Sequence, residues 1–446
     1  MKRLWILIFA GFFFSILNGE AQETFDLQKL LNSAVANNAE VKKAALKQTE
    51  SEYMKKEAVA HGLPQVDGKI NYTMMGIPQI NIPSDFASSL PQDLLPILQQ
   101  LQGIDRLYTA SAGVTASQLV YSQSYIEGIR QANKAGELYD VMRQKTEDEV
   151  IYDVATLYYQ LKNHYATLKI LDENIQNLKK IDTVLTLQYE NDLAKQTDVQ
   201  RVQVKIANLR TNKESLKDAI DIRERMLKIV CGIPTDSAFM VDTVSNNGEL
   251  QSPEVSRFNV EDLPDFQLLK KQEEMAQLKV KSGQADYYPN LAVFGQYNFS
   301  SYSTNANLNL SGVTTGGVKA TVPIFSSFMR HSKVMQAKIQ LQEVQEDVDL
   351  HKKQLGTGYQ HAANSLVSAW DALQAQEENV ALARNVYQQV QLSFHEGMSS
   401  LTDLLSVESS MLEAESLYHQ QVLRYQIARL DMKKSTGNLQ KIISSK

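Results

Sequence analysis

The residue types that usually carry chemistry are present in this chain of 446 residues, but they are scattered. A metal site needs several ligands that the fold can bring together, and none of the seven histidines forms a close ligand pair with another. Serine and aspartate are plentiful, yet the chain has no nucleophile elbow and no glycine-rich phosphate loop. We therefore predict that the protein is not an enzyme and has no catalytic residue, no metal and no cofactor.

Cysteine content and charge exclude two further classes of protein. The single cysteine, Cys231, cannot form an internal disulfide, and its place near a predicted helix end favours a buried thiol. The formal net charge is −6, with acidic and basic residues interspersed. Proteins that bind nucleic acid usually present a basic face, so we expect no nucleic-acid partner.

Two aspartates, Asp198 and Asp403, occupy equivalent positions in a segment that occurs twice. Residues 188–198 (QYENDLAKQTD) correspond to residues 393–403 (SFHEGMSSLTD), an offset of 205 residues that also relates Gly232 to Gly437. A single long offset indicates tandem duplication rather than a short-period solenoid. Since a short side-chain oxygen can satisfy free N–H groups at a helix start, Thr197 or Asp198 could also cap the helix that follows.

Long helices are expected to position these segments. Apolar residues recur every seven positions at Val154, Leu161, Leu168 and Ile175, and a second apolar series interleaves with them. This heptad pattern predicts coiled-coil packing over a helix about 100 Å long. Gly232 then ends the return helix. The predicted long helices cover residues 122–189, 197–231, 327–394 and 402–434.

Four segments alternate between apolar and polar residues. They cover residues 64–74, 110–121, 289–300 and 316–325, and this alternation is typical of a membrane β-strand or of a half-buried strand in a soluble sheet. Four strands cannot close into a barrel, and an open edge in lipid leaves unpaired backbone groups. The chain must therefore oligomerise if these strands span a membrane. Residues 76–106, between the first two strands, are expected to form a surface loop that could also plug the outer mouth.

The N-terminus indicates export. Lys2 and Arg3 precede an apolar run, and Gly19 and Ala21 are suited to a cleavage site, so residues 1–21 are predicted to be a secretory signal peptide. The first repeat would then span residues 22–232, with a helix at 26–61, and the second would span 266–437, with a helix at 266–286. A linker or equatorial segment (233–265) separates them, and residues 438–446 form a tail.

This order of elements resembles the TolC-like outer-membrane efflux protein family, also called outer membrane factors. The resemblance rests on the duplicated order, on Phe394-x-x-Gly397-x-x-Ser400-x-x-Asp403-Leu404-Leu405 and on Val322-Pro323-Ile324-Phe325. It implies a mixed α and β membrane protein in which each chain has duplicated strand pairs and long coiled-coil hairpins. It also implies a homotrimer with one 12-stranded β-barrel, continued by a periplasmic α-helical tunnel.

The resemblance also implies a function. The chain would be the outer-membrane channel of a tripartite efflux or type I secretion system in a Gram-negative bacterium, extending into the periplasm. It would contact outer-membrane lipid and would export passively, with a periplasmic adaptor and an inner-membrane pump as partners. The exported substrate and the pump class stay open. The alternative is a secreted coiled-coil scaffold or a periplasmic adaptor, which would carry one hairpin flanked by soluble β-domains.

The resemblance assigns a periplasmic gate to the second repeated segment. Aligned on Gly397, the first gate carboxylate of the family falls on Asp403, and the second falls on Ser406, which is not acidic. Asp198 is the duplicate of Asp403 and joins the expected gate. A tyrosine and an arginine that latch the closed state in the family fall on Phe394 and Ser399, so their usual hydrogen bonds cannot form.

The turns between the paired helices are the expected sites of adaptor contact. They contain Asp192 and Leu193 in the first repeat, and Gly397, Met398 and Ser400 in the second. Asp192 stands where the second repeat has Gly397. Because glycine favours a left-handed backbone and aspartate tolerates it, we expect that conformation at both positions.

Overall fold

The computed structural model describes residues 24–76, 106–242, 252–304 and 309–444, together with Pro91 and Leu250. The predicted signal peptide lies outside the described residues, as does nearly all of the loop expected at 76–106. Long helices and one antiparallel sheet make up most of the described chain, so the mixed α and β fold class is confirmed.

The chain forms two compact units, and each of them draws on both sequence repeats. The first unit comprises Met1–Gln48, Leu138–Lys270 and Asp347–Lys446, and the second comprises Thr49–Glu137 and Lys271–Glu346. Each unit thus combines corresponding parts of the two repeats. The division into repeats describes the sequence and stays a prediction.

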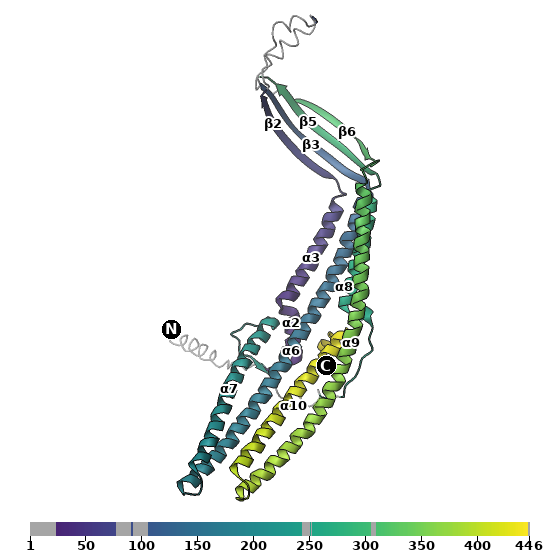
Figure 1. The fold of residues 1–446 in the computed structure, drawn as a ribbon. Helices are drawn as coiled ribbons and strands as arrows, with labels where there is room; N and C mark the ends of the chain where they lie inside the picture. Colours follow the sequence, from purple (N-terminus) through teal and green to yellow (C-terminus); the bar gives the residue numbers. More distant parts are fainter. Residues whose placement is uncertain are drawn as a thin grey trace, which may run out of the picture. The chain divides into compact units, whose positions relative to one another are not determined.

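The second unit contains a four-stranded antiparallel sheet with the strand order β2-β3-β5-β6 (Figure 1). The strands are β2 (Gln65–Gly76), β3 (Arg106–Ser122), β5 (Asn290–Ser303) and β6 (Ser311–Thr321). Residues paired across antiparallel strands point to the same face. The row Asp67, Thr115, Gln296 and Thr315 is therefore one polar row across the sheet.

Neighbouring rows of the sheet alternate in character. Ile70 pairs with Ala112, which pairs with Phe299, and this row lies on the face opposite the polar row. The row after it, Asn71, Ser111, Ser300 and Ser311, is polar again. The alternation expected from the sequence therefore produces one polar face and one largely apolar face.

The last strand ends earlier than predicted. We expected a strand over residues 316–325, but β6 covers Ser311–Thr321. Pro323 has no N–H to donate to a strand ladder, and Ser327 and Phe328 have positive φ angles of 48° and 63°. The chain therefore leaves the sheet before α9 begins at Met329.

The first predicted helix, 26–61, is two helices, α2 (Leu27–Asn37) and α3 (Ala39–Ala60). The break lies at Asn38, whose Oδ1 accepts hydrogen bonds from the backbone N–H groups of Glu40 (2.7 Å) and Val41 (3.3 Å). Its Nδ2 donates to the carbonyl of Val230 at 2.8 Å. A buried asparagine thus starts a new helix inside what looks like one apolar pattern.

Two long helical hairpins follow the strand pairs. The first consists of α6 (Gln123–Glu190) and α7 (Gln196–Cys231), and the second of α9 (Met329–His395) and α10 (Leu401–Ser435). Helix α8 (Pro264–Ala285) begins two residues before its predicted start, with a proline at the first helical position. The smaller elements are β1 (Thr24–Phe25), β4 (Met240–Val241), η1 (Val260–Asp262) and α11 (Lys441–Ser444).

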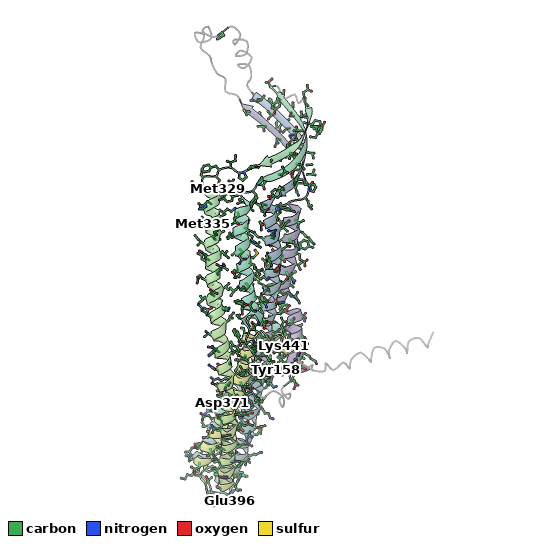
Figure 2. All side chains as sticks on the ribbon, turned by 90° about the vertical axis from the view of Figure 1, so that its right-hand side faces the viewer. Tyr158, Met329, Met335, Asp371, Glu396 and Lys441 are labelled. Atoms are coloured by element: carbon green, nitrogen blue, oxygen red, sulfur yellow. The ribbon has the colours of Figure 1, made fainter. Side chains whose placement is uncertain are left out.

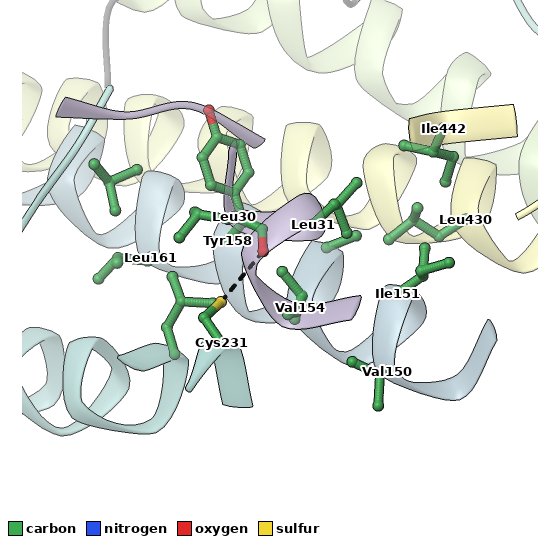
Figure 3. Close-up of a cluster of buried hydrophobic side chains, with 14 of the residues drawn as sticks. Leu30, Leu31, Val150, Ile151, Val154, Tyr158, Leu161, Cys231, Leu430 and Ile442 are labelled. Carbon is green, nitrogen blue, oxygen red and sulfur yellow. Dashed lines mark hydrogen bonds between the residues drawn. The ribbon is translucent and has the colours of Figure 1, made fainter. Parts of the chain in front are cut away.

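The heptad residues form the helical cores. Leu30, Val154, Tyr158 and Leu161 pack around Cys231, which is fully buried as predicted (Figure 3). Burial raises the pKa of this thiol to about 12, and its Sγ–H donates to the carbonyl of Leu30. The thiol therefore has a packing role. Among the described residues, no helix is long and apolar enough to cross a membrane.

Candidate functional site

The turn of the first hairpin is built by backbone hydrogen bonds. The N–H of Asp192 donates to the carbonyl of Tyr189 at 3.0 Å, and that of Leu193 donates to Gln188 at 2.8 Å. Together they form a Schellman motif, which ends a helix through one left-handed residue. Asp192 has a φ of 59°, so the left-handed backbone predicted there is present.

The second hairpin has the same motif 205 residues later. The N–H of Gly397 donates to Phe394 at 3.1 Å, that of Met398 donates to Ser393 at 2.8 Å, and Gly397 has a φ of 75°. Glu396, next to it, lies at the end of the hairpin (Figure 2). The repeated sequence therefore produces a repeated turn.

The turn residues are mostly open to solvent. Leu193 and Met398, the apolar residues directly after the left-handed positions, are 78% and 73% exposed. Phe394 is half-buried and packs against the apolar cluster behind the turns, and Ser399 is also half-buried. Two exposed apolar side chains at equivalent places suit a contact with another molecule.

Asp403 takes part in a capping box at the start of α10. The hydroxyl of Ser400 accepts a hydrogen bond from the backbone N–H of Asp403 at 3.1 Å. The carboxylate of Asp403 in turn accepts from the backbone N–H of Ser400 at 3.3 Å and from its hydroxyl at 2.7 Å. This pair satisfies free N–H groups at the helix start, so Asp403 has a structural role whatever else it does.

The cap expected on α7 is absent. The helix begins at Gln196, so its N-cap is Lys195, which makes no side-chain capping bond. Thr197 and Asp198 therefore lie inside the first turn, and the prediction that one of them caps the helix is wrong. The Lys195 side chain, which stands where the second repeat has Ser400, has no oxygen to accept a hydrogen bond.

Asp198 instead lies beside a cation that reaches the second hairpin. Its Oδ1 is 3.9 Å from Nη1 of Arg201, and the same Nη1 donates to Oγ1 of Thr402 at 2.9 Å. Thr402 is adjacent to Asp403. The structure thus brings the starts of α7 and α10 together, while Ser406 lies exposed on α10.

The sequence prediction missed a buried carboxylate near the tips. The side chain of Glu408 is only 1% exposed, and its Oε2 is 3.4 Å from Nζ of Lys205, which also donates to Oγ of Ser409. Burial raises the pKa of Glu408, and Lys205 opposes this effect. The signal in the sequence is an acidic residue at a heptad core position, in the series Leu401, Leu404, Glu408 and Met411.

Metal ligands do not gather in the described part of the chain. Over those residues, no group of three or more histidine, cysteine, aspartate or glutamate side chains is arranged to hold an ion. The absence of a cofactor stays a prediction.

The duplicated fold and tip geometry can be compared with known proteins. Residues 261–438 match the family described as outer membrane efflux protein. Outer membrane protein TolC of Escherichia coli (strain K12) is 18% identical over 378 residues, which cover 81% of this chain and 75% of that protein. TolC of Vibrio cholerae is 19% identical over 337 residues, with 74% and 77% covered.

Solved structures of membrane channels share this fold. The structure of CusC has a TM-score of 0.74 at 17% identity and covers 92% of each chain. The CmeC outer membrane channel of Campylobacter jejuni has a TM-score of 0.73 at 16% identity, with 94% of this chain and 88% of that chain covered.

These comparisons show that the chain is similar to outer-membrane efflux proteins. Residues 261–438 therefore resemble the outer membrane efflux protein family, and the relatives with matching sequence are outer membrane proteins named TolC.

Proposed function

We propose that the chain is the passive export duct of a tripartite efflux or type I secretion system. Three copies would each contribute four strands to one twelve-stranded barrel, and their helical hairpins would continue it as a tunnel into the periplasm. A periplasmic adaptor and an inner-membrane pump would complete the system, with the pump supplying the energy.

One observation carries this proposal, namely a two-faced sheet whose edges are open. Within the described residues, β2 and β6 each pair on one side only. The apolar face includes Ile70, which is 85% exposed in the single chain. An apolar face suits lipid, and an open edge in lipid leaves backbone groups unpaired at several kcal/mol each. Closure with further copies removes both problems.

The hairpin turns are the proposed docking points for the adaptor. Leu193 and Met398 supply the apolar contact, and the left-handed turns at Asp192 and Gly397 set their direction. Ser400 caps the helix behind the second turn.

The proposed gate is a ring of Asp403 side chains around the threefold axis. Carboxylates of three chains would repel one another and attract cations. Ser406 adds no second acidic ring, and Asp198 is held beside Arg201. Phe394 and Ser399 replace the tyrosine and arginine of the family, so the latch must use other residues.

The experiment is conductance of the purified full chain in planar lipid bilayers. We expect pores that divalent cations block from the periplasmic side. We expect Asp403→Asn to weaken the block by about tenfold, because the charge is lost while one oxygen remains to accept the capping hydrogen bonds. Ser400→Ala is the control, since it breaks the capping box and keeps the charge.

Three results would count against this proposal. Block that is unchanged in Asp403→Asn would remove the gate role. A wild-type chain that forms no pores would remove the duct itself. Recovery of the chain as a soluble periplasmic protein would favour an adaptor or scaffold.

A further inference from the structure

The two hairpins share one apolar core near their tips. Its buried residues come from all four long helices of the two hairpins, so the first hairpin cannot move away from the second without exposing this core. The buried members include Leu178 of α6, Val202 of α7, Tyr387 of α9 and Leu404 of α10.

Several polar atoms inside this core lack a well-formed hydrogen bond. Among the described residues, neither carboxylate oxygen of Glu408 meets a hydrogen-bond donor in good geometry, and the same holds for Oδ1 of Asn174 and Oη of Tyr387. Both Asn174 and Tyr387 are themselves buried. Buried polar groups are normally paired, so a group of unpaired atoms in one place requires an explanation.

Lys205 compensates only part of the charge. Its Nζ lies 3.4 Å from Glu408, but it also donates to Ser409, and its side chain is 27% exposed. A buried ion pair offsets the loss of hydration only when its geometry is good and further hydrogen bonds satisfy the remaining atoms. Here the side chain of Asn174 supplies a weak further contact, and burial outweighs Lys205 and Asn174 together, so the pKa of Glu408 is raised.

We propose that Glu408 is a destabilising element that poises the two hairpins to separate when the channel opens. The inference rests on the proposed duct function. In the paired hairpins the carboxylate is out of water, and Lys205 and Asn174 offset only part of the lost hydration. When the hairpins part, it regains water, and this gain offsets some of the loss of the apolar contact. Lys205 limits the effect and keeps the paired arrangement favoured.

This proposal predicts opposite effects for the two members of the ion pair. Glu408→Gln removes the buried charge and should hold the hairpins together more tightly. Lys205→Met removes the cation that compensates the charge and should loosen them. A simple ionic latch predicts that both substitutions loosen the hairpins.

Amide hydrogen exchange over Leu401–Met411, measured on the full chain in detergent, tests this without requiring conductance. We expect exchange to slow about threefold in Glu408→Gln and to accelerate about tenfold in Lys205→Met. Glu413→Gln is the matched control, because this glutamate lies exposed on the same helix and should leave the exchange unchanged. In planar bilayers, the channel should be open for a smaller fraction of the time in Glu408→Gln and for a larger fraction in Lys205→Met.

Faster exchange in both variants would overturn the proposal in favour of a latch, and unchanged exchange in Glu408→Gln would overturn it outright. Failure of the wild-type chain to conduct would refute the proposed duct. The exchange result would still show whether Glu408 destabilises the paired hairpins. Glu408→Met serves as a second variant that removes the charge, should the glutamine side chain disturb the fold.

Discussion

At the scale of the residue, two glycines with a left-handed backbone are needed for different reasons. Gly397 has a φ of 75°, and a Cβ added there would meet no atom within 4 Å. Gly437 has a φ of 69°, and its Cβ would lie 2.7 Å from the carbonyl oxygen of Asp262. The first position needs glycine for its backbone alone, and the second needs it for space as well.

We therefore expect Gly397→Ala to reduce the free energy of unfolding by about 1 kcal/mol, the strain of a left-handed non-glycine residue. Gly437→Ala should reduce it by about twice as much or more, because the backbone of Asp262 must also move. Asp192→Gly is the matched control and should be neutral or slightly stabilising. Thermal melting of the purified chain in detergent measures all three, and equal losses for the two alanine variants would contradict this account.

At the scale of the element, the repeat accounts for most of what the sequence predicted. The offset of 205 residues placed both turns in register. The heptads placed Val154, Leu161 and Ile206 in helical cores, because apolar residues at this spacing share one face of a helix. The break at Asn38 was missed, because its amide bonds to Val230, which is distant in the sequence.

The candidate site was predicted less completely than the fold. The positions of Asp192 and Gly397 followed from the repeat. The interaction between Lys205 and Glu408 did not, because it joins different hairpins. The periodicity of a sequence does not show which faces of two helices meet. The missing cap at Lys195 was foreseeable only from knowledge of the helix start. The gate assigned to Asp403, Ser406 and Asp198 stays a prediction.

The contact between Gln440, near the C-terminus, and Asp148 of α6 should depend on pH, because the Asp148 carboxyl titrates. Burial raises the pKa of this carboxyl to about 6, against a hydrogen bond from Gln440, and Glu147 and Asp265 add repulsion. The pKa of Asp148 is higher in the folded chain than in the unfolded chain. The contribution of its neutral form to the free energy of unfolding is therefore fully present below about pH 4 and is lost as the pH rises through about 6.

Asp148→Asn keeps this side chain neutral at every pH. We expect the variant to be more stable than wild type above about pH 6, by about 1 kcal/mol after allowance for partial solvent exposure, and equal to it below about pH 4. Melting temperatures across this range test the prediction. Glu190→Gln, an exposed carboxylate at the far end of α6, is the control, and a gain that does not vary with pH would refute the role of burial.

At the scale of the whole molecule, the edges of the sheet predict that further chains complete it. The strand β6 pairs with β5 on one side, and no strand in the described part of the chain pairs with its other side. Along such a strand, consecutive residues direct their N–H groups alternately toward and away from the partner. One of Thr314 and Thr315 therefore donates toward β5, and the other donates toward the open edge.

Proline substitution at these two threonines distinguishes a closed barrel from an open sheet, because proline removes one N–H donor from the strand. In a closed trimer, both Thr314→Pro and Thr315→Pro delete a hydrogen bond, one within the chain and one to the next copy. In an open sheet, only one of them does so. We expect both variants to lower the fraction of trimer, measured by native mass spectrometry of a chain whose full-length mass is 50.2 kDa. An edge-facing proline with no effect, in a protein that stays monomeric, would show that the sheet does not close through β6.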